Sequence, residues 1–550
     1  MFSIKVSSRS CLRKLFCLSG LLLALQLSSC EKDEVLNEPV GEQQTVSSEI
    51  RLGAKVESPF LLRNMQRSVD TLSARSGLRS LTILKPTHLY VRFLPADTAQ
   101  YERLVADTTL DLDSYPLDYE LTEGDSYHDP SLPADAITWQ YTVVPANYDL
   151  KWLGITYEVL DELYILDEDL EREDISVGDT QFRSGKGSGL SWKSVVDEAL
   201  IQTGNVGETT LRSKWTPAAT IKAYDDLMGK YIPLQGVKVR IRYFSFLKAY
   251  HYTDANGNVT FSSKRTSVEY SIEWERDMWD IRDDGTQAYY HGPDQKGRWD
   301  LNINSGAPKS LYYSAIHRAL YKYYYGDCCG LVRPSKSLKI SFENINDPNG
   351  SALGYTRSPN VRTWNWIFNS IKIYGKKIIK ENDKEVVVSQ LVSDVFSVTL
   401  HELAHASHAC RMSRSGYDET SSIIKDSWAD AVGWIMTLDE YRKLGLSVSD
   451  IADLSSDMDN HWWPNYHMTE LLIYSPLFID MVDVENQGQE VLYRPFDEVS
   501  GYTMSLIDSN LPMMKNFMDV ENFMKNNRPA NVTINQINTF LKIYREKWIK

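Results

Sequence analysis

The feature that most constrains the fold is a pair of histidines four positions apart inside an apolar-patterned stretch. Between Ser393 and Arg411, apolar residues recur at the spacing of one face of an α-helix. They are Val395, Phe396, Leu400, Leu403 and Ala404. His401 and His405 are one helical turn apart, so both imidazoles project from the same side. The sequence therefore predicts a helix from Ser393 to Arg411, with Ser393 as its N-cap.

This histidine spacing is the one that two ligands need to reach a single zinc ion. Glu402 stands beside the first histidine and can reach a metal-bound water without being a ligand. His-Glu-x-x-His on a helix is the motif of zinc metallopeptidases. We therefore predict a Zn²⁺ site with His401 and His405 as ligands and Glu402 as the general base that acts on a zinc-activated water. The alternative is a solvated helix face with two unligated histidines.

A second helix is predicted from about Ser421 to Leu444, ended by Gly445. Asp426 and Asp430 lie one turn apart on it. One carboxylate can be the third metal ligand, and the other can accept a hydrogen bond from a ligand histidine and fix its tautomer. We predict Asp426 as the ligand and Asp430 as the orienting residue. Two histidines and one carboxylate leave a position for water, which is typical of catalytic zinc sites.

This stretch, roughly residues 396–435, resembles the thermolysin-like gluzincin metallopeptidases. In that family a Tyr follows the motif helix, a Glu ligand follows nine residues later, and an orienting Asp four residues after that. Tyr417, Asp426 and Asp430 stand at these intervals, and the segment from His405 to Asp426 is one residue longer. The resemblance implies a zincin-like domain, peptide hydrolysis, and Tyr417 as a catalytic residue that stabilises the oxyanion. Because Asp is one methylene shorter than Glu, the two helices must pack closer than in the family, or the carboxylate must bind through a different oxygen geometry.

Alternatives remain for several roles. Glu419 competes with Asp426 as the third ligand, although it has no orienting partner one turn later. The family also uses a downstream histidine at the oxyanion, for which we expect His467, with His461 as the alternative. His408 lies on the metal-facing side of the motif helix, one turn further along. We expect it at the surface, with a cleft-lining position as the alternative.

At 550 residues the chain is long enough for several domains. We predict a multidomain α+β fold, with β-rich domains first and a mainly α-helical, zincin-like catalytic domain at the C-terminal end. The predicted parts are a lipoprotein signal peptide (1–29), a flexible tether (30–75), an N-terminal β-rich domain (76–182), a linker and helix (183–212), a β-sandwich (213–275) and the metallopeptidase domain (276–550). Peptide substrates of gluzincins pair with an edge strand, for which Gly350–Tyr355 and Ile371–Tyr374 are candidates.

The sandwich prediction rests on period-two alternation and a turn. Val237–Arg242 alternates, and Asp254–Asn258 forms a turn before Val259–Phe261. The pattern resembles carboxypeptidase-regulatory-like, transthyretin-type modules. Such modules are accessory, so the resemblance implies no chemistry for this part.

The N-terminus predicts export and lipidation. Basic residues at positions 5, 9, 13 and 14 precede the apolar stretch Leu15–Leu27, which suits a signal-peptide core and is too short to span a bilayer. Leu27–Cys30 resembles a bacterial lipobox, which implies cleavage before Cys30 and attachment of lipid. A plain secretory signal is the alternative. Glu31–Glu34 resembles the export signal of Bacteroidota surface lipoproteins, so we expect the chain at the outer membrane, facing outward.

The charge balance is acidic. Removing residues 1–29 takes away four positive and no negative charges, so the net charge goes from −15 to −19. Because no basic stripe stands out, we expect no nucleic-acid partner. The cysteines after Cys30 are odd in number and include an adjacent pair, which is not a disulfide framework.

The leading functional prediction is a zinc metallopeptidase that acts on proteins or peptides. One alternative is a zinc hydrolase with a non-peptide substrate. The other is a non-enzymatic surface lipoprotein that binds glycan or protein through its many aromatic residues.

Overall fold

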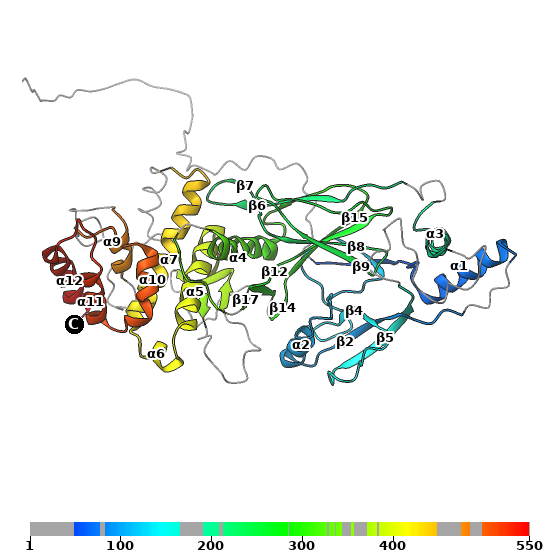
Figure 1. Ribbon diagram of the computed structural model, residues 1–550, viewed down its shortest axis with the longest axis horizontal. Helices are drawn as coiled ribbons and strands as arrows, with labels where there is room; N and C mark the ends of the chain where they lie inside the picture. The colour runs from blue at the N-terminus through cyan, green and yellow to red at the C-terminus, as the bar shows by residue number, and fades with distance from the viewer. Residues whose placement is uncertain are drawn as a thin grey trace, which may run out of the picture. The chain divides into compact units, whose positions relative to one another are not determined.

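The computed structural model describes residues 49–77, 83–165, 191–207, 213–283, 285–326, 329–335, 337–343, 354–356, 371–381, 384–447, 475–484 and 498–548. These residues form a mixed α+β fold, with sheets in the N-terminal and middle parts and helices towards the C-terminal end (Figure 1). The predicted mixture of α and β structure and its order along the chain are thus confirmed. Within this part of the chain, no helix combines the length and apolar character needed to cross a membrane.

The N-terminal part contains a three-stranded antiparallel sheet with β2 at its centre, between β4 and β5. A small second sheet pairs β1 with β3. The elements are β1 (Leu52–Lys55), α1 (Leu62–Arg75), β2 (His88–Leu94), α2 (Thr98–Val105), β3 (Tyr119–Leu121), β4 (Gln140–Pro145), β5 (Thr156–Leu163) and, further along the chain, α3 (Trp192–Gln202).

The structure differs from the tether predicted for residues 30–75, because β1 and α1 lie inside that range. Met65 and Val69 of α1 are one turn apart and fully buried, in one core with Trp192 and Val195 of α3. The tether prediction followed the polar composition of this stretch and missed the apolar face of α1, where Leu62, Met65, Val69 and Leu72 recur at helical spacing. Its packing partner lies far along the chain, where a local pattern does not reach.

The middle of the chain forms a sandwich of two four-stranded sheets. One contains β6 (Ala218–Asp225), β7 (Lys230–Pro233), β10 (Asn258–Thr260) and β16 (Trp299–Ile303). The other contains β8 (Lys238–Tyr243), β9 (Leu247–Tyr252), β11 (Val268–Glu273) and β15 (Tyr289–Gln295). The rings of Tyr270 on β11 and Trp299 on β16 are 5.5 Å apart, which brings the two sheets together in one core.

The sandwich extends beyond its predicted end at residue 275, because β15 and β16 each complete one sheet. Between β11 and β15 the chain leaves the sandwich and enters a six-stranded sheet. Its strands are β12 (Glu275–Arg276), β13 (Trp279–Asp283), β14 (Thr286–Gln287), β17 (Leu338–Glu343), β18 (Gly354–Thr356) and β19 (Ile371–Tyr374). The sandwich and the following sheet are therefore interlaced, and a single boundary at 275 does not separate them.

The helices of the C-terminal part surround α5, which carries the histidine motif. Nearly all residues of α5 are buried, and it packs against α4, α7, β18 and β19 (Figure 1). The helices are α4 (Pro308–Tyr325), α5 (Val392–Cys410), α6 (Arg414–Glu419), α7 (Ser422–Lys443), α9 (Leu477–Val482), α10 (Met504–Asn510), η1 (Leu511–Met513), α11 (Phe517–Asn526) and α12 (Ile534–Trp548). The hairpin of β20 (Lys376–Glu381) and β21 (Lys384–Ser389) precedes α5.

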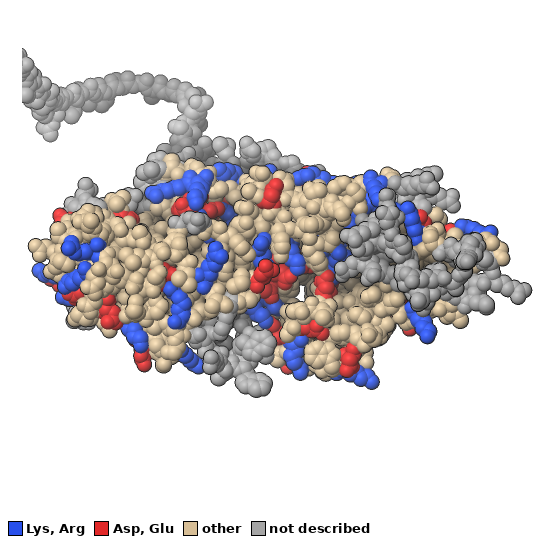
Figure 2. All heavy atoms as spheres, viewed as in Figure 1, with Lys and Arg blue, Asp and Glu red and all other residues tan. Residues whose placement is uncertain are grey.

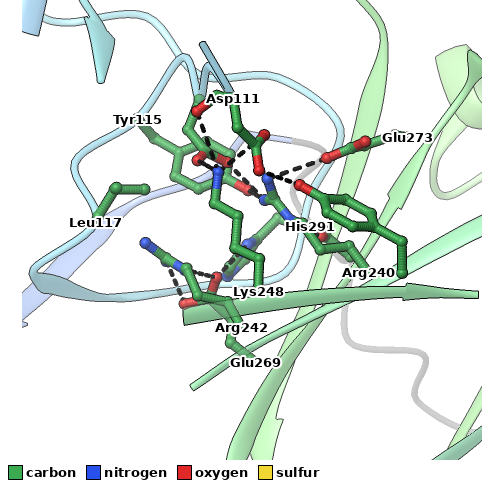
Figure 3. A network of polar contacts seen from close by, with 12 residues as sticks. Asp111, Tyr115, Leu117, Arg240, Arg242, Lys248, Glu269, Glu273 and His291 are labelled. Carbon is green, nitrogen blue, oxygen red and sulfur yellow. Dashed lines mark hydrogen bonds and ion pairs between the residues drawn. The ribbon is translucent and has the colours of Figure 1, made fainter. Parts of the chain in front are cut away.

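A buried charge network joins the loop before β3 to the second sheet of the sandwich (Figure 3). Arg240 on β8 forms ion pairs with Asp113 at 2.6 Å and with Glu273 at 3.1 Å, and it donates a hydrogen bond to the hydroxyl of Tyr115 at 2.7 Å. Lys248 on β9 reaches Asp113 at 2.7 Å. Each of these buried charges has a partner of opposite sign, and Arg240 and Asp113 each have two, so the charges are compensated within the interior.

A second joint connects the sandwich to the helices around α5. Asp225, fully buried at the end of β6, accepts hydrogen bonds from Arg318 Nη1 on α4 and from the hydroxyl of Tyr441 on α7, both at 2.8 Å. Asp226 Oδ2 accepts a hydrogen bond from the backbone N–H of Val392, the first residue of α5, at 2.8 Å. Two consecutive aspartates of the sandwich thus contact all three helices.

The contact between Asp226 and Val392 explains why the start of α5 differs from the prediction. Leu391 is the N-cap residue and its side chain makes no capping bond, whereas Ser393 lies inside the first turn. The prediction of Ser393 as the cap was wrong, because Asp226, from a distant part of the sequence, satisfies the N–H group instead.

Candidate metal centre

The centre is built on α5 and α7, which pack closely. Gly433 on α7 faces α5, and a Cβ atom at this position would lie 3.2 Å from the carbonyl oxygen of Ser397 and 3.5 Å from Cβ of His401. Larger side chains at this crossing would separate the helices. The close packing that a short aspartate ligand requires is therefore present.

Three side chains from these helices meet at one point. Nε2 of His401 lies 3.1 Å from Nε2 of His405, which lies 3.3 Å from Oδ1 of Asp426. Donor atoms of the three residues all lie within 4.8 Å of one another. Ligands about 2.1 Å from a tetrahedral zinc ion would be about 3.4 Å apart. The described residues contain no other group of His, Cys, Asp and Glu with this spacing.

These three residues fit a divalent metal ion in both donor type and spacing. Two imidazoles and one carboxylate also suit other first-row divalent ions, so the donor set by itself does not select zinc.

Both histidines direct Nε2 to the cluster and Nδ1 away from it. Nδ1 of His401 lies 2.8 Å from Oδ1 of Asp430, so the structure brings the predicted orienting residue to a predicted ligand histidine. Nδ1 of His405 lies 3.3 Å from the hydroxyl of Tyr417 on α6. An outer partner of this kind fixes the orientation of a ligand imidazole.

The pKa values of residues in and beside the cluster are shifted from their ordinary values. Burial lowers the pKa of His401, but the Asp430 carboxylate more than reverses this effect and raises it to about 9. Burial also raises the pKa of Asp430 and of Glu402, and the two histidines oppose it in both cases. The buried pair of His401 and Asp430 therefore retains a proton in the metal-free protein.

The other predicted residues have different positions. Glu402 is buried next to both histidines, whose charges act on it. Glu419 is outside the cluster, with a side chain that is 66% exposed and pairs with Lys515 at 3.1 Å. His461 and His467, the candidates for the oxyanion, lie outside the described residues, as does Cys30.

His408 is fully buried, so the expected surface position was wrong. Its ring packs edge-on against the ring of Tyr417, with centroids 5.2 Å apart and an interplanar angle of 83°. Burial lowers the pKa of His408 to about 3, so the ring is neutral at neutral pH. The sequence placed His408 one turn past a ligand, but it did not show that α5 is enclosed on almost every side.

Two residues that support this centre were not identified from the sequence. Gly433 sets the approach of the helices, and Asp226 holds the start of α5. Asp226 stands in a polar turn after a strand, and this pattern predicts a turn without indicating which distant helix the side chain reaches.

The resemblance to gluzincins rests on the residues of these helices. No protein-family model matches the chain, and no curated protein or solved structure matches it either.

Proposed function

We propose that this chain is a zinc-dependent metallopeptidase with Glu402 as its general base. The observation that carries the proposal is the meeting of His401, His405 and Asp426 from two helices, with Glu402 buried beside them. Asp430 adds support, because a carboxylate bound to Nδ1 of a ligand histidine is a common outer partner in zinc sites.

Each residue of the proposed site has its own role in peptide hydrolysis. His401, His405 and Asp426 would hold the zinc ion, which when bound supplies Lewis-acid activation of water and of the scissile carbonyl. Glu402 accepts a proton from the attacking water and later gives it to the leaving amine. Burial raises the pKa of Glu402, and this brings the carboxyl closer to the pH at which an acid–base catalyst works best.

A peptide substrate would pair with the strand nearest to α5. Of the two candidate segments, Ile371–Tyr374 is β19, which lies inside the sheet between β17 and β18. β18, which overlaps the other candidate, ends the strand order of the described residues and contacts α5. We propose that an extended peptide adds, by backbone hydrogen bonds, to the edge of β18 that pairs with no other described strand.

The proposal includes a lipid anchor at Cys30 and a location at the outer membrane, facing outward. Lipidation would attach the chain to the membrane surface. On the face shown in Figure 2, acidic and basic side chains are interspersed, without a large area of one sign. The proposed partners are therefore a protein or peptide substrate and the membrane.

The experiment that tests the function uses the purified full-length chain. Metal analysis should find about one zinc ion per chain, and the protein should cleave a mixture of quenched fluorescent peptides. Glu402→Gln should retain the zinc and lose cleavage, because it removes only the proton acceptor. Glu419→Gln, which changes an exposed carboxylate, should retain both.

Each outcome distinguishes between the candidates. A chain without zinc would exclude both zinc hydrolases, and unchanged turnover in Glu402→Gln would exclude the mechanism. Zinc without peptide cleavage would favour the hydrolase of a non-peptide substrate.

A further inference from the structure

The hydroxyl of Tyr417 lies beside Nδ1 of His405, on the edge of the ring that faces away from the candidate metal ligands. The hydroxyl oxygen is 3.3 Å from Nδ1 of His405, while Nε2 of the same ring is 3.1 Å from Nε2 of His401 and 3.3 Å from Oδ1 of Asp426. An imidazole that offers Nε2 to a metal carries its proton on Nδ1. In that state Nδ1–H donates a hydrogen bond and the hydroxyl oxygen of Tyr417 accepts it.

The position of Tyr417 is fixed from several sides. Its backbone N–H donates a hydrogen bond to the carbonyl oxygen of Ser413 at 2.9 Å. Nζ of Lys425 donates to the carbonyl oxygen of Tyr417 at 3.4 Å and lies 4.9 Å from the centre of its ring. The ring of His408 packs against the ring of Tyr417, and neither ring nitrogen of His408 has a hydrogen-bond partner among the described residues. His408 therefore holds Tyr417 in place by packing of the two rings and not by a hydrogen bond.

A tyrosine hydroxyl, whose ordinary pKa is about 10, is protonated at neutral pH. A neutral phenol has an oxygen that accepts from His405 and a proton that it can still donate elsewhere. The two ligand histidines thus have different outer partners, a carboxylate for His401 and a neutral hydroxyl for His405.

We infer that Tyr417 is a positioning residue for the metal ligand His405, as Asp430 is for His401. The inference rests on the zinc site proposed above. It concerns the oxygen lone pair of Tyr417, whereas the oxyanion role implied by the gluzincin resemblance would use the hydroxyl proton.

The test begins with the wild-type chain loaded with zinc and labelled with ¹⁵N-histidine. The Nδ1–H groups of His401 and His405 should each give a proton resonance that is protected from exchange with water. Without a protected signal from His405 the inference fails, whatever any variant does. The signal from His401, which Asp430 holds, serves as the internal reference.

Tyr417→Phe removes only the hydroxyl. It should abolish the His405 signal, retain the His401 signal and weaken zinc binding by about 10–100-fold, as measured by competition with a chelator. Tyr502→Phe is the matched control, because it removes a buried hydroxyl that donates to the carbonyl oxygen of Met524 at 2.8 Å. The control should leave zinc affinity and both signals unchanged.

The outcomes separate this inference from the proposed function. If the wild type binds zinc and Tyr417→Phe binds it equally well, the inference fails alone. A variant that loses only kcat, with zinc affinity unchanged, would assign Tyr417 to the oxyanion and also overturn the inference. A wild-type chain that binds no zinc would overturn the proposed function and this inference with it.

Discussion

Zinc binding by this chain is expected to release a proton from His401. In the metal-free protein the Asp430 carboxylate, 2.8 Å from Nδ1, outweighs burial and raises the pKa of His401 to about 9. A ligand imidazole must be neutral, so zinc competes with this proton.

The size of the effect follows from the pKa. At pH 7, about two units below the pKa of His401, about one chain in a hundred carries a neutral ring, so the apparent zinc affinity is about 100-fold weaker than above pH 9. Affinity should rise about tenfold per pH unit between about 7 and 9. The stability of the metal-free fold changes with pH in the opposite direction. The raised pKa contributes stability fully below the ordinary 6.5, and this contribution is lost as the pH rises through about 9.

Calorimetry in two buffers of different ionisation enthalpy would count the protons released at pH 7, and chelator competition would give the affinity at each pH. Asp430→Asn is the control, because it removes the charge that raises the pKa of His401. In this variant proton release at pH 7 should fall and the pH dependence should flatten. A wild-type affinity that is constant from pH 7 to 9, or an equal slope in Asp430→Asn, would refute the reasoning.

Three further outcomes are expected. Asp426→Ala should lose zinc while Glu419→Ala keeps it, as read by metal analysis; the reverse result would make Glu419 the third ligand. Asp225→Ala should lower the free energy of unfolding by about 3–5 kcal/mol in urea, because it removes the closest partner of the buried Arg318 guanidinium, which keeps only Glu440 at 3.7 Å. Tyr441→Phe, which removes one hydrogen bond to the same carboxylate, should lower it by about 1 kcal/mol, and equal losses would contradict the ion-pair argument. Cys30→Ala should abolish labelling by radioactive palmitate and move the chain from the membrane fraction to the soluble one, so retained label would rule out this anchor.

The candidate site was predictable as far as it depends on helical spacing. A helix places residues four apart on one face, so the pairs His401 with His405 and Asp426 with Asp430 follow from the sequence. That the two pairs meet depends on the crossing of α5 and α7, where Gly433 allows close approach. No local pattern contains that contact; the spacing of Asp426 and Asp430 suggested a third ligand with an orienting partner, and the family resemblance supported this choice.

The errors have the same origin. Residues 30–75 were predicted to be a tether because their composition is polar, yet Met65 and Val69 of α1 are buried against α3. His408 was predicted to lie at the surface because the sequence motif does not show which elements cover the rest of α5. In each case the burial of a side chain depends on a partner that is remote in the sequence.

The sandwich was expected to be accessory, but its contacts with α5 and α7 indicate that it supports the helices of the candidate metal centre. α5 and α7 run antiparallel, so the end of α7 at Tyr441 lies near the start of α5 at Val392. Asp225 and Asp226 hold these two ends from a single turn of the sandwich. The predicted metal ligands lie further along the same helix pair, beyond the close contact at Gly433. Because a close-packed interior transmits strain, we expect a change in this turn to shift the two histidines relative to Asp426. The geometry of the candidate centre would then depend partly on residues that belong to another layer of the fold.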